Sequence, residues 1–212
     1  MEKGMLLSAD MVRATLDNRK RMTRRMNRLK EINESPDSWQ LVNFEENACL
    51  KRGLIETFFI ATFINKDSGV CKNIKCPWAP GDILWFRETY TEIDGEIFYR
   101  ADGYPDVELR DRFEQTKSKK IKWKPSLFMP RRAARLFGDT QELRIERLLD
   151  ITEEEAILEG FTPLLSGSGE VIRTARERFI NYFMGLNSKA KTPLDPNPWV
   201  WVIEYEEAED YA

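Results

Sequence analysis

Histidine is absent from this sequence of 212 residues. Without it, the chain can build no Ser-His-Asp or Cys-His nucleophile and no His-ligated zinc site. Any catalysis must therefore use Lys, Asp, Glu, Thr, Ser, Tyr or Cys side chains. The sequence also lacks an apolar run near the roughly 20 residues that cross a bilayer, and its N-terminus has no signal-peptide pattern. We therefore expect a soluble, cytoplasmic protein that does not bind a membrane.

Cysteine is scarce, because the chain has only Cys49, Cys71 and Cys76. An odd number in a chain of this length argues against a disulfide framework and favours a reducing compartment. The three thiolates could hold a zinc ion, but their spacing is loose and an acid would have to be the fourth ligand. We therefore expect no metal and no other cofactor.

The charges are unevenly distributed, although the formal net charge is only −3. Basic residues crowd into residues 13–30 and again into 117–135, whereas acidic residues gather at 153–155 and 204–210. Local basic blocks of this kind bind phosphate even on a chain whose total charge is negative. A content of 42% hydrophobic and 33% charged residues is ordinary for a globular protein, and we expect a single domain.

Turn and capping residues divide the chain into short elements. Ser8 predicts a helix that ends near Asn18, residues 32–52 look irregular, and residues 54–64 predict a strand. A strand over 83–90 and a hairpin turn at Asp94-Gly95 follow. Further elements are predicted as a strand over 143–149, a capped helix over 152–160, a loop at 166–169, a helix over 173–184 and a strand over 199–205. Short strands with inserted helices predict a small α+β barrel.

The segment Asn18–Arg25 reads N-R-K-R-M-T-R-R, and it resembles the signature G-x-K-x-x-E-x-R of the ASCH superfamily. Lys20 and Arg25 match, Asn18 replaces the glycine, and Thr23 replaces the glutamate. A bacterial branch of that superfamily, the N4-acetylcytidine amidohydrolases, has R-K-x-x-T-x-R here. Residues 148–160 resemble the family's L-x-x-(I/L)-T…A-x-x-E helix. The resemblance places the catalytic glutamate of the amidohydrolases at Glu159.

The wider chain is similar to a phage and prophage group of ASCH-like proteins. The similarity lies in residues 8–12, 76–78, 80–89, 123–131 and 197–204. It implies one PUA-like (ASCH) β-barrel domain over residues 1–212, with inserted helices and long loops at about 28–75, 103–122 and 161–196. It also implies the host cytoplasm as the location if the protein is phage-encoded.

The basic motif has two interpretations. In the first, neighbouring cations and partial burial lower the pKa of Lys20 toward neutrality. The neutral amine would take a proton from a water or from the Thr23 hydroxyl, which shares its face if the segment is helical. Glu159 would protonate the departing amine or orient the water, and Arg25 would stabilise an oxyanion or hold a phosphate. In the second, the basic run with Arg19, Arg24 and Arg25 is a solvated surface or a phosphate clamp, and Glu159 is an ordinary helix-end carboxylate.

A second basic block surrounds Trp123 and includes Lys122 and Lys124, with Lys117, Lys119 and Lys120 before them. Such a mixture of charge and aromatic ring is typical of a groove for single-stranded nucleic acid, although a solvated loop with Trp123 covering the barrel fits equally. Arg131 extends the block. Trp85 and Arg87 share one face of a strand, and this face either lines the pocket or belongs to the core.

Three functions remain open at this point. The first is binding of RNA, single-stranded nucleic acid or a modified nucleoside, with metal-independent amide hydrolysis of N4-acylated cytidine by Lys20, Thr23 and Glu159. The second is a ribonuclease of the ASCH type, in which Lys20 and Arg25 stabilise the phosphorane. The third is a non-catalytic phage accessory module that binds RNA or a host protein.

Overall fold

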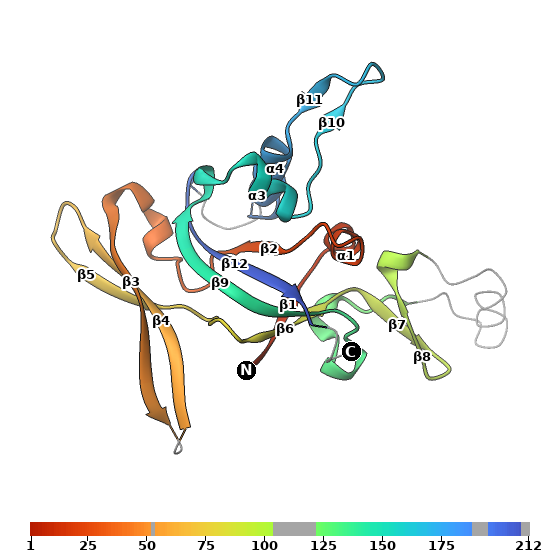
Figure 1. Cartoon of the computed structure of the whole chain (residues 1–212), viewed down its shortest axis with the longest axis horizontal. Helices are drawn as coiled ribbons and strands as arrows, with labels where there is room; N and C mark the ends of the chain where they lie inside the picture. Colours follow the sequence, from red (N-terminus) through yellow and green to blue (C-terminus); the bar gives the residue numbers. More distant parts are fainter. Residues whose placement is uncertain (52–53, 104–121, 188–194, 209–212) are drawn as a thin grey trace. The chain divides into compact units, whose positions relative to one another are not determined.

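A computed structural model describes residues 1–51, 54–103, 122–187 and 195–208 (Figure 1). The fold is mixed α+β, with many strands in several sheets and few helices. The chain packs as two compact units, each of which draws on separate stretches of sequence. Unit 1 consists of Met1–Arg19, Ile83–Asp139 and Glu206–Ala212, and unit 2 consists of Lys20–Asp82 and Thr140–Tyr205.

Unit 1 is built around the parallel pairing of β1 with β6. Its strands and α-helix are β1 (Glu2–Leu6), α1 (Ala9–Leu16), β6 (Ile83–Arg87), β7 (Tyr90–Ile93), β8 (Glu96–Tyr99) and the start of β9 (Phe137–Arg147). Its 3₁₀ turns are η3 (Arg100–Asp102), η4 (Ser126–Phe128) and η5 (Arg131–Ala133). Gly4 lies against Trp85, where an added Cβ would come within 2.7 Å of the indole carbon Cζ2. The close approach of β1 to β6 therefore requires a residue without a side chain at this position.

Unit 2 contains the remainder of β9, which continues into an antiparallel arrangement with β12 and β2. Its strands are β2 (Met22–Arg25), β3 (Trp39–Lys51), β4 (Leu54–Asn65), β5 (Cys71–Lys75), β10 (Leu164–Leu165), β11 (Val171–Arg173) and most of β12 (Trp199–Glu207). Its helices and turns are η1 (Ile32–Glu34), η2 (Pro36–Ser38), η6 (Leu148–Asp150), α3 (Glu153–Leu158) and α4 (Ala175–Asn187). Aromatic contacts join its sheets, with the Phe63 and Trp199 rings 5.2 Å apart and the Phe44 and Trp201 rings 6.0 Å apart.

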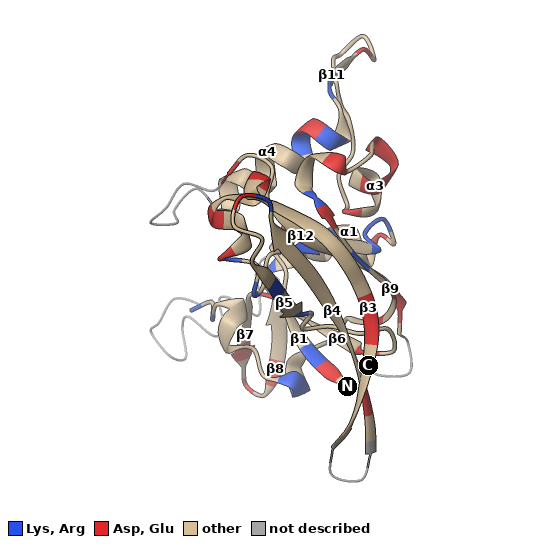
Figure 2. Cartoon of the chain, turned by 90° about the vertical axis from the view of Figure 1, so that its left-hand side faces the viewer, with Lys and Arg blue, Asp and Glu red and all other residues tan. Residues whose placement is uncertain are grey.

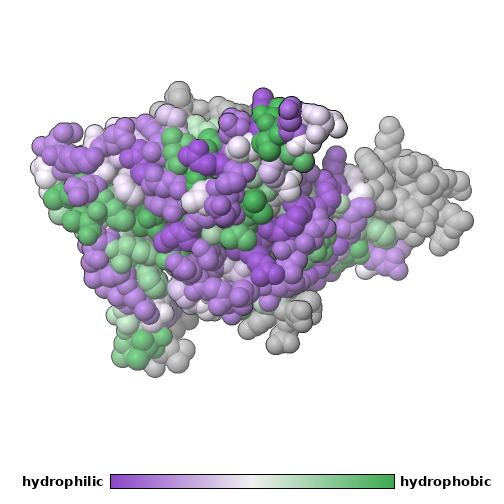
Figure 3. Space-filling model, turned by 45° about the horizontal axis from the view of Figure 1, so that its top comes forward, coloured by the Kyte–Doolittle hydropathy of each residue, from purple (hydrophilic) through white to green (hydrophobic). Residues whose placement is uncertain are grey.

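The strand orders are open in the part of the chain that the structure describes. In unit 1 the order is β1-β6-β9, and in unit 2 the orders are β9-β12-β2 and β3-β4-β5. No sheet of the described residues closes into the predicted barrel. None of the described helices has the length and apolarity that a bilayer-crossing segment needs. The face drawn in Figure 3 is largely hydrophilic, with smaller hydrophobic patches.

Several elements are confirmed where local chemistry defines them. Ser8 caps α1 by accepting a hydrogen bond from the Met11 amide, and Asn18 has the left-handed φ of +57° that its position after the helix predicted. The β7–β8 hairpin turns at Asp94-Gly95, and Thr152 forms the predicted capping box at the start of α3. The strand β12 is also confirmed, and β4 covers the predicted residues 54–64.

Other boundaries were wrong. Residues 39–51, predicted as irregular, form the 13-residue strand β3, because they pair along the full length of β4. β9 begins at Phe137 rather than at residue 143. The predicted loop at 166–169 is confirmed, and it forms the turn of the β10–β11 hairpin. The predicted loop over 103–122 lies almost entirely outside the described residues.

Candidate functional site

The basic motif of unit 2 is extended. Lys20 forms an isolated antiparallel bridge with Glu159, the Arg21 amide donates to the Leu158 carbonyl at 2.8 Å, and β2 begins at Met22. The expectation that Lys20 and Thr23 share a helical face is therefore wrong. In an extended chain, residues three apart point to opposite sides, because side chains alternate. Lys20 and Arg24 lie on one side, and both reach Glu159.

The Lys20 amine is buried, with 3% of the residue exposed. Its nitrogen Nζ donates to Glu159 Oε2 at 2.8 Å, to the Met22 carbonyl at 2.7 Å and to the Glu159 carbonyl at 3.0 Å. Burial lowers the pKa of Lys20, the charges of Arg25 and Arg24 lower it further, and Glu159 opposes them. The structure thus brings Lys20 and Glu159 together from positions 139 residues apart.

Glu159 is placed by the end of α3. The helix starts with the capping box in which Thr152 and Glu155 exchange hydrogen bonds, and Glu159 is its C-cap. Gly160 then adopts a φ of +94°, the left-handed conformation that ends helices and favours glycine. The acidic first turn of α3 is visible as red segments in Figure 2. Glu159 is 3% exposed, as is Lys20, so its carboxylate is buried as deeply as the Lys20 amine.

A network of ion pairs encloses the Lys20–Glu159 pair. The side chain of Arg24 is fully buried, and its guanidinium donates to Glu146 at 2.6 Å, to Glu155 at 2.8 Å and to Glu159 at 3.4 Å. Arg144 contacts Glu146 at 3.2 Å and also pairs with Glu155. Together with Lys20 and Glu159, these residues form what we call the Lys20 cluster: Lys20, Arg24, Arg144, Glu146, Glu155 and Glu159.

The sequence did not reveal most of this cluster. Arg24 was predicted to contact nucleic acid, but its guanidinium lies inside the unit on three carboxylates. Arg144 and Glu146 were not singled out, although their spacing of two residues on a strand places them on the same face. Glu204, which pairs with Arg144 at 2.6 Å, was also missed. The signal in the sequence was a pair of opposite charges two positions apart on one strand, Arg144 and Glu146.

Arg25 lies near the other edge of the site and is partly buried. Burial lowers its pKa, whereas the charge of Glu159 and the hydroxyls of Tyr205 and Tyr182 act in the opposite direction. Tyr182 belongs to an aromatic group on α4, in which its ring is 5.3 Å from Phe161. The guanidinium of Arg24 stands 5.7 Å from the ring of Phe179 in the same group. One wall of the Lys20 cluster is therefore aromatic.

Thr23 and Arg19 differ from Lys20 in their surroundings. Thr23 is 2% exposed and pairs with Ile203 in the β2–β12 ladder. None of the three hydrogen bonds of the Lys20 amine goes to Thr23. Arg19 belongs to unit 1 and forms an exposed ion pair with Asp17 at 2.8 Å. The structure therefore joins two of the three predicted catalytic residues directly.

The other predicted binding residues lie in unit 1. The guanidinium of Arg87 stacks over Trp85 at 5.1 Å, so these two side chains do share a face. Lys122 and Lys124 are exposed, whereas Trp123 is partly buried and its indole nitrogen is enclosed. Arg131 pairs with Glu2 at 2.8 Å. Lys117, Lys119 and Lys120 lie outside the described residues.

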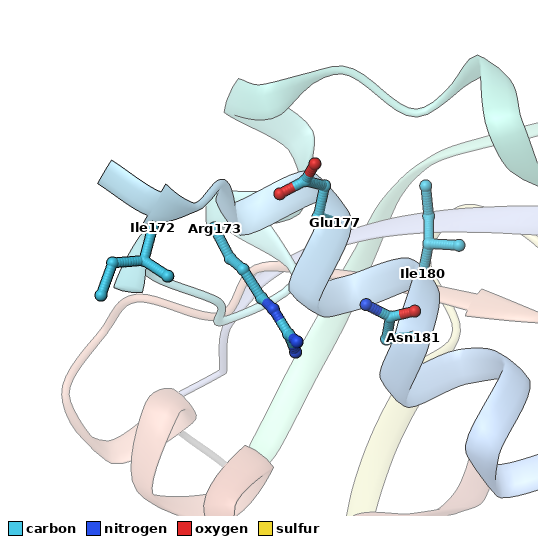
Figure 4. Close-up of a pocket in the computed structure, with 5 residues that line it drawn as sticks. All are labelled: Ile172, Arg173, Glu177, Ile180 and Asn181. Atoms are coloured by element: carbon cyan, nitrogen blue, oxygen red, sulfur yellow. The ribbon is translucent and has the colours of Figure 1, made fainter. Parts of the chain in front are cut away.

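No group of three or more Cys, Asp or Glu side chains in the described ranges has the arrangement of a metal centre. Cys49 and Cys71 are exposed and Cys76 is buried, and none of the three forms a disulfide within the described residues. A cavity of about 450 Å³ lies between β11 and α4, lined by Ile172, Arg173, Glu177, Ile180 and Asn181 (Figure 4). It does not include the Lys20 cluster.

No family model, no curated protein and no solved structure matches this chain. The ASCH resemblance of the motif therefore stays a prediction. In chemical terms, the site combines an amine that can lose a proton with a carboxylate at hydrogen-bond distance and a nearby guanidinium. Such a set can move protons to and from a substrate without a metal.

Proposed function

We propose that the protein recognises a modified nucleobase and hydrolyses its exocyclic amide without a metal, with N4-acylated cytidine as the substrate. The observation that carries this proposal is the buried Lys20 amine on the Glu159 carboxylate, 2.8 Å away. Burial lowers the pKa of that amine, as a general base near neutral pH requires. The ASCH resemblance of the motif agrees with this chemistry, and a PUA-like barrel is part of the proposal.

The reaction begins with a proton transfer inside the pair. The proton of the Lys20 ammonium passes to Glu159, which leaves a neutral amine and a carboxylic acid. The amine then takes a proton from water as the hydroxide adds to the acyl carbon, and Arg25 stabilises the oxyanion that forms. When the C–N bond breaks, the Glu159 acid gives its proton to the departing N4. The products are a carboxylic acid and cytidine, and the ion pair is restored.

Water is the nucleophile in this scheme because none of the three hydrogen bonds of the Lys20 amine goes to the Thr23 hydroxyl. The alternative is direct attack by the Thr23 hydroxyl. Replacing Thr23 by valine separates the two routes, because valine keeps the shape and removes the hydroxyl. Retained hydrolysis in T23V supports water, and complete loss in a folded variant supports Thr23.

The proposal is tested by deacetylation of N4-acetylcytidine, followed by absorbance. We expect Lys20→Ala to lower the rate by about 10²- to 10⁴-fold, the usual contribution of a general base. Arg19→Ala is the matched control, since it removes a neighbouring exposed cation that pairs with Asp17, and it should leave the rate unchanged. Circular dichroism establishes that both variants are folded. Equal inertness of wild type and K20A would reject the hydrolase.

The same samples distinguish the other functions. Cleavage of a labelled RNA that is lost in K20A indicates a ribonuclease, in which Lys20 and Arg25 act on the phosphorane. Binding of RNA or of a host protein without turnover indicates a non-catalytic module. The exposed free thiols of Cys49 and Cys71 support a reducing location, so we place the protein in the cytoplasm.

A further inference from the structure

Two large apolar side chains of unit 1 are exposed to solvent. Phe128 is 68% exposed and Leu127 is 57% exposed, and both belong to η4. Burying a side chain of this size stabilises a fold by roughly 1.5–3 kcal/mol, so exposure of two neighbours is unfavourable for folding alone. Exposed apolar groups rimmed by polar residues mark interaction sites.

The backbone beneath Phe128 is well fixed. Tyr90 of β7 exchanges backbone hydrogen bonds with Lys124 at 2.7 and 3.2 Å, and its hydroxyl donates to the Phe128 carbonyl at 3.3 Å. Met129 is 1% exposed and packs with Tyr90 and Ala133 in the core of the unit. The buried Met129 thus anchors the end of η4, while the preceding side chain, Phe128, faces solvent. The Phe128 ring is presented by an ordered element.

Five cations lie on β6, on η5 and in residues 122–124, the segments that contact β7 and η4. Strand β7 contacts two of the segments that carry cations. Thr91 donates to the Lys122 carbonyl at 3.2 Å, and Glu92 pairs with Arg132 at 3.4 Å. Arg87 donates to the Leu127 carbonyl, and Lys124 lies 5.4 Å from the Tyr90 ring. We call this set the Phe128 surface: Arg87, Lys122, Lys124, Leu127, Phe128, Arg131 and Arg132. Among these cations, Arg131 pairs with Glu2 and Arg132 pairs with Glu92.

We propose that the Phe128 surface binds single-stranded nucleic acid, with an unpaired base stacked on Phe128 and phosphates on Lys122, Lys124 and Arg132. A ring face among cations is the arrangement that holds single strands, because every unpaired base has a π-face and every phosphate a negative charge. Trp123 is less suited to stacking, since it is partly buried. This binding site is separate from the proposed hydrolysis at Lys20 and does not depend on it.

The test is fluorescence anisotropy with a labelled single-stranded RNA and a single-stranded DNA of mixed sequence, at several salt concentrations. We expect Phe128→Ala to weaken binding by about 5- to 100-fold, the range that loss of one stacked base gives. Phe128→Trp should preserve binding. Lys124→Gln should lower the slope of log affinity against log salt by about 0.7, the value for one phosphate of a single strand.

Ile172→Ala is the matched control, because Ile172 is a large apolar residue that is 57% exposed, close to the 68% of Phe128, but lies in unit 2. Wild-type affinity in F128A, or no binding of either oligonucleotide by the wild type, would overturn the proposal. Binding of vesicles that contain anionic lipid, without binding of oligonucleotides, would assign the surface to a membrane instead. F128A should still hydrolyse the free nucleoside and K20A should still bind the oligonucleotide, so failure of one proposal is distinct from failure of the other.

Discussion

Each unit encloses a cluster of charges, and the two clusters differ in whether an amine accompanies the guanidinium groups. In unit 2 the Lys20 cluster holds an amine, whereas in unit 1 the guanidinium of Arg135 lies between Glu88 and Asp102, at 2.8 and 2.7 Å. A guanidinium does not release its proton at any ordinary pH, but a buried amine does. Both units therefore bury charge, but of these two clusters only the Lys20 cluster can transfer a proton within its cation–carboxylate pair.

Burial shifts the pKa of one group in each cluster toward its neutral form. Burial lowers the pKa of Lys20, which favours its neutral form. Burial raises the pKa of Glu88, against the opposing effect of Arg135, and likewise raises the pKa of Tyr99, whose ring lies 3.9 Å from the Arg135 guanidinium. Although burial opposes it, bonds to Glu88 and Asp102 raise the pKa of Arg135. The unit 1 cluster therefore holds its cation more firmly.

The largest expected effect comes from removing the central guanidinium of each cluster. Arg24→Met removes the fully buried guanidinium that pairs with Glu146, Glu155 and Glu159, and we expect a loss of about 3–5 kcal/mol in unfolding free energy. Arg135→Met should cost less, roughly 1–3 kcal/mol, because Asp102 is 49% exposed and can be solvated. Urea denaturation measures both. Equal losses would mean that the two clusters are equally enclosed.

The next effect is on the pH dependence of stability. Between the lowered folded pKa of Lys20 and its unfolded value of about 10.4, the unfolded chain binds more protons, so wild-type stability rises with pH relative to Lys20→Met.

Glu88 has the opposite effect on how stability changes with pH. Between about pH 4.3 and its raised folded pKa, the folded chain binds more protons, so wild-type stability falls with rising pH relative to Glu88→Gln.

Each slope is at most about 1.4 kcal/mol per pH unit for one proton. Urea titrations of wild type and both variants, at pH 4 to 10, measure the differences. Parallel curves for wild type and K20M would show that the Lys20 amine stays charged at every pH in the range. That result would also remove the base from the proposed reaction.

The smallest effect is expected at the rim of the unit 1 cluster. Asp102→Asn removes one partner of Arg135, but Asp102 is half exposed and Glu88 remains in place, so stability should fall by less than about 1 kcal/mol. High salt should reduce the difference further, because the pair is screened by solvent ions. A thermal or urea melt of D102N at two salt concentrations measures it. A loss larger than that of R135M would contradict the central position of Arg135.

Local chemistry in the sequence predicted the elements that depend on a few neighbouring residues. Ser8, Asp94-Gly95 and the Thr152–Glu155 capping box each specify their turn or helix end without help from the rest of the chain. Strand β3 could not be predicted in the same way, since it is defined by its ladder with β4. The pairing of Lys20 with Glu159 was expected only through the motif resemblance.

The surroundings of the site were beyond the reach of the sequence. A run of arginines is normally solvated, so the burial of Arg24 could not be read from residues 18–25. It depends on Glu146 and Glu155, which are more than 120 residues away and reach Arg24 only after β9 and α3 have packed. The choice between Trp123 and Phe128 as the exposed ring likewise depends on packing, because Met129 fixes which way η4 faces.

The position of β12 has a consequence for synthesis on the ribosome. This strand, Trp199–Glu207, lies between β9 and β2, so β2 waits for a partner that is translated more than 170 residues later. At roughly 5–20 residues per second, β2 is without its strand partner for about 10–35 s after it is made. Unit 2 is therefore expected to fold late and to be open to chaperones or proteases until β12 leaves the exit tunnel.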